Sequence, residues 1–148
     1  MRRNTPGQGA VEFALSLGMF MLLVMGIIDI SRAFFVQETV QQAASDGARR
    51  AGVCQLRDTA TSPPTVTTSI DYAVYRSLFN LDWANITLIV AYDNNGSAIV
   101  GRQVTVTAAY VYDPITPLIS PILRGTLGTT PTLTGKATST VEQVAATC

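Results

Sequence analysis

A run of apolar residues near the N-terminus constrains this chain more than any other feature. Between Ala10 and Ile30 the only charged residues are Glu12 and Asp29. A helix needs about 20 residues to cross the hydrocarbon core of a bilayer, so this run is long enough to span a membrane. Two arginines, Arg2 and Arg3, precede it. Because basic residues favour the cytoplasmic side, we expect a cytoplasmic N-terminus and an extracytoplasmic chain after residue 30.

A removable secretory signal peptide is the alternative interpretation of this run. Such a peptide also begins with basic residues and an apolar core. Here the core is long, and residues 29–35 continue a helical pattern where a cleavage site between small residues would be required. We therefore expect a retained membrane helix.

The helical pattern continues beyond the membrane. Apolar or small residues recur every three or four positions and predict one buried helix face: Ala33, Val36, Val40, Ala43, Ala44, Gly47 and Ala51. Polar residues occupy the other face of the helix: Gln37, Glu38, Gln41, Gln42, Asp46 and Arg49. Asp46 also has a favourable spacing for ion pairs with Arg49 and Arg50.

One helix from Gln8 to Val53 is the simplest interpretation. It would be about 70 Å long, more than twice the thickness of the bilayer core. Residues 8–30 then cross the membrane, and residues 31–53 must pack on the rest of the chain.

Residues 54–148 predict a small extracytoplasmic domain. After a linker around residues 58–65, apolar spacing indicates a helix over residues 70–81 that Ser69 caps. Residues 86–92 and 103–112 are rich in β-branched residues and flank the turn sequence 93–96, which predicts a hairpin. Residues 133–142 predict a third strand. The expected fold class is α+β, with a long N-terminal transmembrane helix, a second helix and an antiparallel sheet of about three strands.

The composition argues against catalysis and against nucleic acid as a partner. Histidine is absent, which excludes the usual histidine-dependent nucleophile systems and the commonest metal ligand. Ten basic residues balance ten acidic ones, and they form no long cluster. No carboxylate pair, nucleophile motif or phosphate-binding glycine loop is present. We expect neither an enzyme nor a catalytic, metal or cofactor site.

The stretch from Gly7 to Phe13 contains a charged residue whose position needs an explanation. A carboxylate such as Glu12 is costly in an apolar span unless it has a partner or reaches the interface. Cleavage after Gly7 would make Gln8 the first residue, Glu12 the fifth and Phe13 the sixth, as in type IV pilin precursors. Together with residues 26–33 and 43–51, this stretch resembles the TadE-like pseudopilins of tight-adherence (Tad) pili. The resemblance covers residues 7–52, and Ser45–Asp46 departs from the basic–acidic pair frequent in the family.

The resemblance implies how the protein is processed and where it works. A prepilin peptidase would remove residues 1–7 by cleaving between Gly7 and Gln8. The mature chain would be a minor pilin in the bacterial inner membrane, associating with lipid, other pilin and pseudopilin subunits and the inner-membrane assembly platform, in a pilus used for adhesion. Glu12, next to Phe13, would pair with the N-terminal amine of a neighbouring subunit and so check the register of assembly. Cyclisation of Gln8 would remove that amine.

Two alternatives remain open from the sequence. Glu12 at headgroup depth would need no partner at all. Separately, the whole chain would be a membrane-anchored extracytoplasmic binding protein or adhesin outside any pilus. The first residue of the native protein separates the two functions.

Small residues form a stripe within the membrane segment. Ala10, Ala14 and Gly18 follow one another at intervals of four, which permits close approach of another helix. Chance is the alternative explanation, because small residues are common in membrane helices.

The two cysteines, Cys54 and Cys148, are expected to form a disulfide. Both lie on the extracytoplasmic side in the topology above, where thiols are readily oxidised. The bond would close a loop of about 95 residues and stabilise the domain by about 4 to 5 kcal/mol. Two free thiols, or an intermolecular bond through Cys148, are the alternatives.

Overall fold

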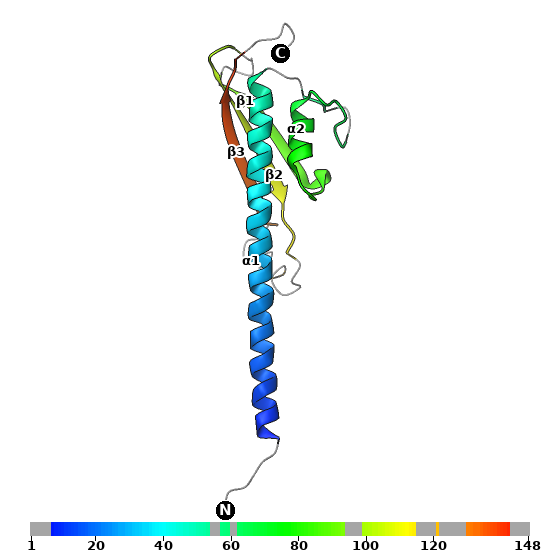
Figure 1. Cartoon of the computed structure of the whole chain (residues 1–148), viewed down its shortest axis with the longest axis vertical. Coiled ribbons are helices and arrows are strands. Elements are labelled where there is room, and N and C mark those ends of the chain that lie inside the picture. Colours follow the sequence, from blue (N-terminus) through cyan, green and yellow to red (C-terminus); the bar gives the residue numbers. More distant parts are fainter. Residues whose placement is uncertain are drawn as a thin grey trace, which may run out of the picture.

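The fold is one long helix with a small sheet and a second helix packed around its C-terminal half (Figure 1). The structure, a computed structural model, describes residues 7–53, 57–59, 62–93, 99–114, 121 and 130–142. Its elements are α1 (Gln8–Gly52), α2 (Ile70–Ser77), the 3-10 helix η1 (Trp83–Asn85), β1 (Ile86–Tyr92), β2 (Gln103–Val111) and β3 (Thr132–Thr140). The α+β class expected from the sequence is confirmed.

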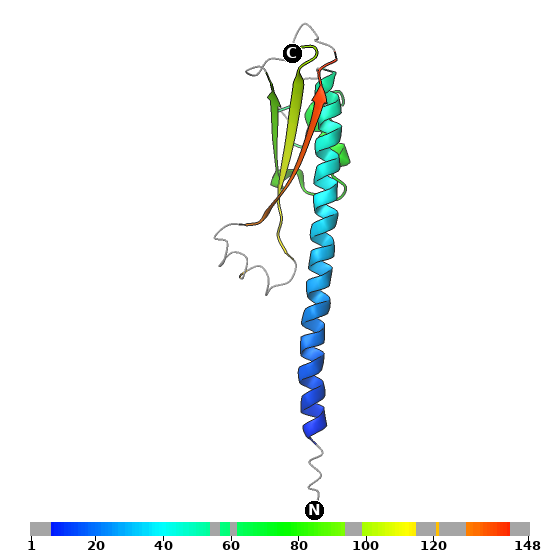
Figure 2. The ribbon, with the colours of Figure 1, turned by 90° about the vertical axis from the view of Figure 1, so that its left-hand side faces the viewer.

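The three strands form an antiparallel sheet in the order β1-β2-β3. Val90 lies opposite Val106, and Val106 lies opposite Ala137, so apolar residues of all three strands share one face. That face packs on α1, as the side view shows (Figure 2). Leu88 contacts residues of both α1 and α2, which places the two helices on the same side of the sheet.

Small residues of α1 let the other elements approach its backbone. A Cβ atom on Gly47 would lie 2.7 Å from Val74 of α2, and one on Gly135 of β3 would lie 2.5 Å from the carbonyl oxygen of Val40. The predicted buried face of α1 is confirmed from residue 36 onward, because its residues there are almost fully buried: Val36, Val40, Ala43, Ala44, Gly47 and Ala51. The core therefore lies where α2 and the sheet pack closely against the backbone of α1, and alanine and valine side chains fill it.

Two glutamines on the polar face of α1, Gln37 and Gln41, contact edge strand β3. Gln41 donates from Nε2 to the carbonyl oxygen of Lys136 (2.9 Å) and accepts from its N–H at Oε1 (3.1 Å), and Gln37 donates to the carbonyl oxygen of Thr134 (3.0 Å). The two side-chain amides thus form hydrogen bonds with backbone groups of β3 that would otherwise be free to pair with a further strand.

The element boundaries follow the predictions closely. Helix α1 ends at Gly52, one residue before the expected end. The Ser69 hydroxyl caps α2 by accepting from the N–H of Tyr72 (3.1 Å). The second helix ends at Ser77 rather than residue 81, and Asn80 takes up the left-handed region that asparagine tolerates (φ 60°). The turn residues 94–96 lie outside the described residues.

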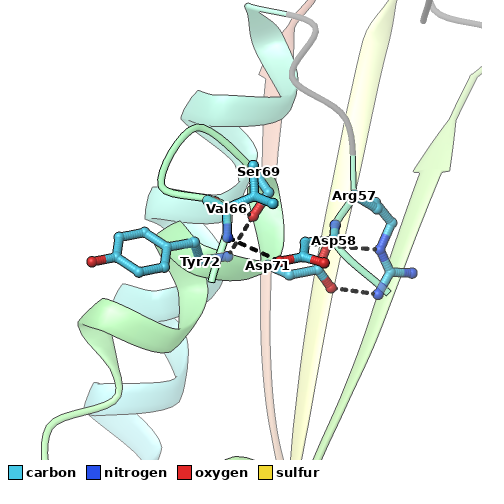
Figure 3. Close-up of polar contacts among 6 residues, drawn as sticks. All are labelled: Arg57, Asp58, Val66, Ser69, Asp71 and Tyr72. Atoms are coloured by element: carbon cyan, nitrogen blue, oxygen red, sulfur yellow. Dashed lines mark hydrogen bonds and ion pairs between the residues drawn. The ribbon is translucent and has the colours of Figure 1, made fainter. Parts of the chain in front are cut away.

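Buried carboxylates organise the segment that precedes α2 (Figure 3). Asp71 is 1% exposed and forms two hydrogen bonds with the guanidinium of Arg57, at 2.8 and 3.3 Å. It also accepts from the N–H of Asp58 (2.9 Å), whose own carboxylate accepts from the N–H groups of Thr65 and Val66. This network fixes the described part of the predicted linker against α2.

Candidate processing and assembly site

The predicted cleavage position coincides with the start of α1. Gly7 is exposed and precedes the first helical residue, Gln8. No side chain caps this helix end, and a Cβ atom on Gly7 would meet nothing within 4 Å. Glu12 lies one turn further, and its carboxylate accepts a hydrogen bond from the side-chain amide of Gln8 (3.3 Å). Gln8 and Glu12 therefore lie on the same face of the first turns.

The apolar part of α1 is exposed along its length. Phe13, Leu15 and Met19 are 67%, 72% and 75% exposed. The helix is long and apolar enough to cross a membrane, and only 6% of its most apolar window is buried within the protein. Because these apolar side chains lie outside the core of the domain, they need a different apolar environment.

The small-residue stripe is open to the outside. Ala10, Ala14 and Gly18 are exposed, and a Cβ atom on Gly18 would have no neighbour within 4 Å. The structure thus places the candidate processing, register and packing residues on one exposed end of the helix, far from the sheet (Figure 1). Their roles stay predictions.

A contact around Asp29 marks the point where the domain begins. Asp29 is 6% exposed, and its carbonyl oxygen accepts a hydrogen bond from the hydroxyl of Tyr112 (3.1 Å). The guanidinium of Arg32 lies over the Tyr112 ring, 5.9 Å from its centroid. Burial raises the pKa of the Tyr112 hydroxyl, and the nearby Asp29 acts in the same direction. This contact leaves residues 8–28 of α1 outside the domain, and we call them the uncovered segment. The segment is about 31 Å long, close to the thickness of a bilayer core.

Among the described residues, Asp46 forms neither of the ion pairs that its spacing to Arg49 and Arg50 favours. The Asp46 carboxylate accepts a hydrogen bond from the Ser77 hydroxyl of α2, and no ion pair joins it to Arg49 or Arg50. The helix spacing allowed those pairs, but α2 packs beside Asp46 and supplies a nearer partner. The sequence offered no signal for this contact or for the pairing of Gln41 with β3.

The predicted disulfide falls outside the described residues. Neither Cys54 nor Cys148 belongs to the part of the chain that the structure describes, so their pairing stays a prediction. Within the described ranges, no group of three or more Cys, Asp or Glu residues is arranged to hold a metal ion.

The described features define a class of protein: a single apolar N-terminal helix carries a small α+β domain on its outer half. Comparison with protein families finds one match: the family model of TadE-like proteins matches residues 7–49, from the candidate cleavage glycine almost to the end of α1. The resemblance to TadE-like proteins is thereby confirmed for this segment of the 148-residue chain. No curated protein and no solved structure matches the chain.

Proposed function

We propose that this protein is a minor pilin that a prepilin peptidase cleaves between Gly7 and Gln8 and that takes part in assembly of a Tad-type pilus. The match to the TadE-like family, which begins at Gly7, carries the proposal. The start of α1 at Gln8 supports it, because the peptide bond to be cut lies at an exposed helix end.

The cleaved chain would have a membrane helix that begins at its first residue. Glu12 then lies one helical turn from the new terminus, on the exposed surface of the helix. A carboxylate in lipid is costly, and the amine of a neighbouring subunit would compensate its charge. The pairing requires that subunits stand in register, so Glu12 would act during assembly rather than during insertion.

The domain would lie outside the inner membrane, on a helix that holds it close to the bilayer. The contact of Tyr112 with Asp29 supports this position, because it leaves the length of one bilayer core uncovered below it. Lipid, the assembly platform and other pilin subunits are the partners that this location offers.

The first residue of the mature protein tests the proposal. We expect intact-mass and N-terminal analysis of the protein from its native host to find Gln8, or its cyclised form, at the N-terminus. The variant Gly7→Val should accumulate as precursor, because the peptidase requires a residue without a side chain at that position. A native protein that still begins at Met1 would instead support a membrane-anchored binding protein outside any pilus.

Glu12 provides the second test. The variants Glu12→Gln and Glu12→Leu should insert into the membrane at least as well as the wild type, since they remove a charge from lipid. Both should reduce incorporation into the pilus machinery, measured as surface pili in the native host. Normal piliation with either variant would contradict the register role.

A further inference from the structure

A groove runs along α1 on the side where α2 packs. Its lower part is lined by Phe35, Glu38, Gln42 and Phe79, and its upper part by Arg49, Arg50 and Arg76. Ser77 lines both parts, so the two parts adjoin at this residue. The residues of α1 that line the groove are at positions 35, 38, 39, 42, 46, 49 and 50, a spacing that keeps them on a single face of the helix.

The upper part of the groove concentrates positive charge. Arg49, Arg50 and Arg76 are all exposed, and none of them has an ion-pair partner among the described residues. The one carboxylate beside them, Asp46, accepts a hydrogen bond from Ser77. Arginine in the last turn of a helix is favourable by itself, but three guanidiniums around one concavity repel one another. A carboxylate from outside would relieve this repulsion.

The lower part of the groove is aromatic and acidic rather than basic. Phe35 and Phe79 are 53% and 75% exposed and flank Glu38, which is exposed and forms no ion pair with a described residue. Both phenylalanines lie above Asp29, on the domain side of the uncovered segment. Exposed aromatic residues in such a position indicate a surface that a partner covers.

The positions of the opposite charges fit a second copy of the chain. Glu38 and Arg49 are eleven residues apart, which is about 16 Å along the axis and within about 20° around it. A second helix that faces the groove in a parallel orientation, displaced by this distance, brings its own Glu38 to the level of the arginines. We propose that the groove receives α1 of a second copy of this chain, displaced outward by about three helical turns. The parallel orientation rests on the proposed function, because both helices then start in the same membrane. At this displacement the first residue of the second copy lies about 10 Å above the level of Glu12, so the neighbour whose amine would pair with Glu12 is a different subunit.

The same displacement explains the two exposed phenylalanines. Eleven residues below Phe35 lies Val24, and Ile28 lies one turn above it on the same face of α1. In the displaced copy these two apolar residues reach the level of Phe35 and Phe79 of the lower copy. Apolar surface that leaves the bilayer would thus contact aromatic side chains rather than water.

Charge reversal tests the contact. The full mature chain in detergent micelles, labelled for energy transfer between copies, should associate about tenfold more weakly with either Glu38→Arg or Arg49→Glu. The double variant Glu38→Arg/Arg49→Glu, and an equal mixture of the two single variants, should both recover association, because each restores opposite charges at one interface. Glu142→Arg, a charge reversal outside the groove, serves as the matched control and should leave association unchanged.

Photo-crosslinking tests the register. Benzoylphenylalanine in place of Phe79 should form adducts with residues 24–28 of the second copy, mapped by mass spectrometry between isotopically distinct chains. Adducts at residues 35–39 would indicate an undisplaced pair and would overturn the proposal.

The outcomes separate this contact from the proposed function. A chain that stays monomeric, or that associates without rescue in the double variant, overturns the second-copy contact, and cleavage between Gly7 and Gln8 would still stand. Association that requires a different pilin subunit also overturns it. Conversely, rescued association in a protein that is never cleaved would retain the contact and refute the pilin role.

Discussion

The two halves of α1 differ in their surroundings and in the size of their side chains. From Gln8 to Phe35 the helix presents large apolar residues that are mostly more than half exposed, and its only buried residue is Asp29. From Val36 to Gly52 it presents alanine, glycine and valine that are almost fully buried. Large exposed residues suit a helix surrounded by lipid, whereas small ones suit a helix whose backbone is approached by other elements. Side-chain size therefore marks the boundary between the exposed half and the buried half of α1 better than hydrophobicity does.

Glycine substitutions should give the largest difference between the halves. Gly135→Val would place side-chain atoms against the backbone of α1 at Val40, where even a Cβ atom comes within 2.5 Å. We expect a loss of about 3 kcal/mol or more in the free energy of unfolding. Thermal unfolding of the full chain in detergent, followed by the fluorescence of Trp83, measures it.

The matched control for this prediction lies in the membrane half. Gly18→Val meets open space and should leave the unfolding transition of the domain unchanged. Equal destabilisation by the two variants would show that the halves do not differ in the way described.

A lysine substitution should separate the halves by their surroundings. Leu22→Lys should reduce stable membrane insertion at a cost of about 3 kcal/mol, because the charge lies well inside the uncovered segment. Gln42→Lys, in the outer half, should insert normally. The fraction of protein that resists alkaline extraction from membranes measures both, and normal retention of Leu22→Lys would argue against a membrane-spanning position for this half.

The amide contacts to β3 should contribute a smaller amount. Gln41→Ala removes two hydrogen bonds to Lys136 and exposes the backbone of the edge strand, so we expect a loss of about 1 to 2 kcal/mol. Gln42→Ala removes the next glutamine, which has no such contact in the structure, and should be close to neutral. If the two variants unfold alike in denaturant, Gln41 does not support the strand.

Tyr112, at the boundary between the halves, should give the smallest effect. Its folded-state pKa is raised above the ordinary value of 10.0, chiefly by burial. The neutral hydroxyl is thus favoured in the folded protein, and its contribution is fully present below pH 10 and is lost as the pH rises through the folded pKa. Tyr112→Phe should cost less than about 1 kcal/mol at neutral pH.

Ultraviolet absorbance measures the same residue directly. In a titration followed at the wavelength of tyrosinate, the wild type should show a larger late component than Tyr112→Phe, in which Tyr92 still titrates late because burial raises its pKa. An identical titration of the two proteins would contradict the burial of this hydroxyl.

The sequence predicted the features that depend on local patterns. The length of α1, its buried face, the Ser69 cap and the strand pairs all follow from spacing and composition along short stretches. The contacts of Gln41 and Asp46 depend on which element lies beside the helix, and no local pattern reports that. Asp71 likewise is an ordinary first-turn acid in the sequence, and only the return of Arg57 to α2 gives this buried carboxylate an ion-pair partner.

The continuity of α1 has a mechanical consequence. No proline interrupts its 45 residues, and one helix passes from the exposed N-terminal end into the core of the domain. A force on the domain is therefore transmitted to the anchor along a single rod of about 68 Å, with no hinge to absorb it. Tilting the anchor turns the sheet by the same angle, and drawing the anchor outward lifts the sheet by the same distance.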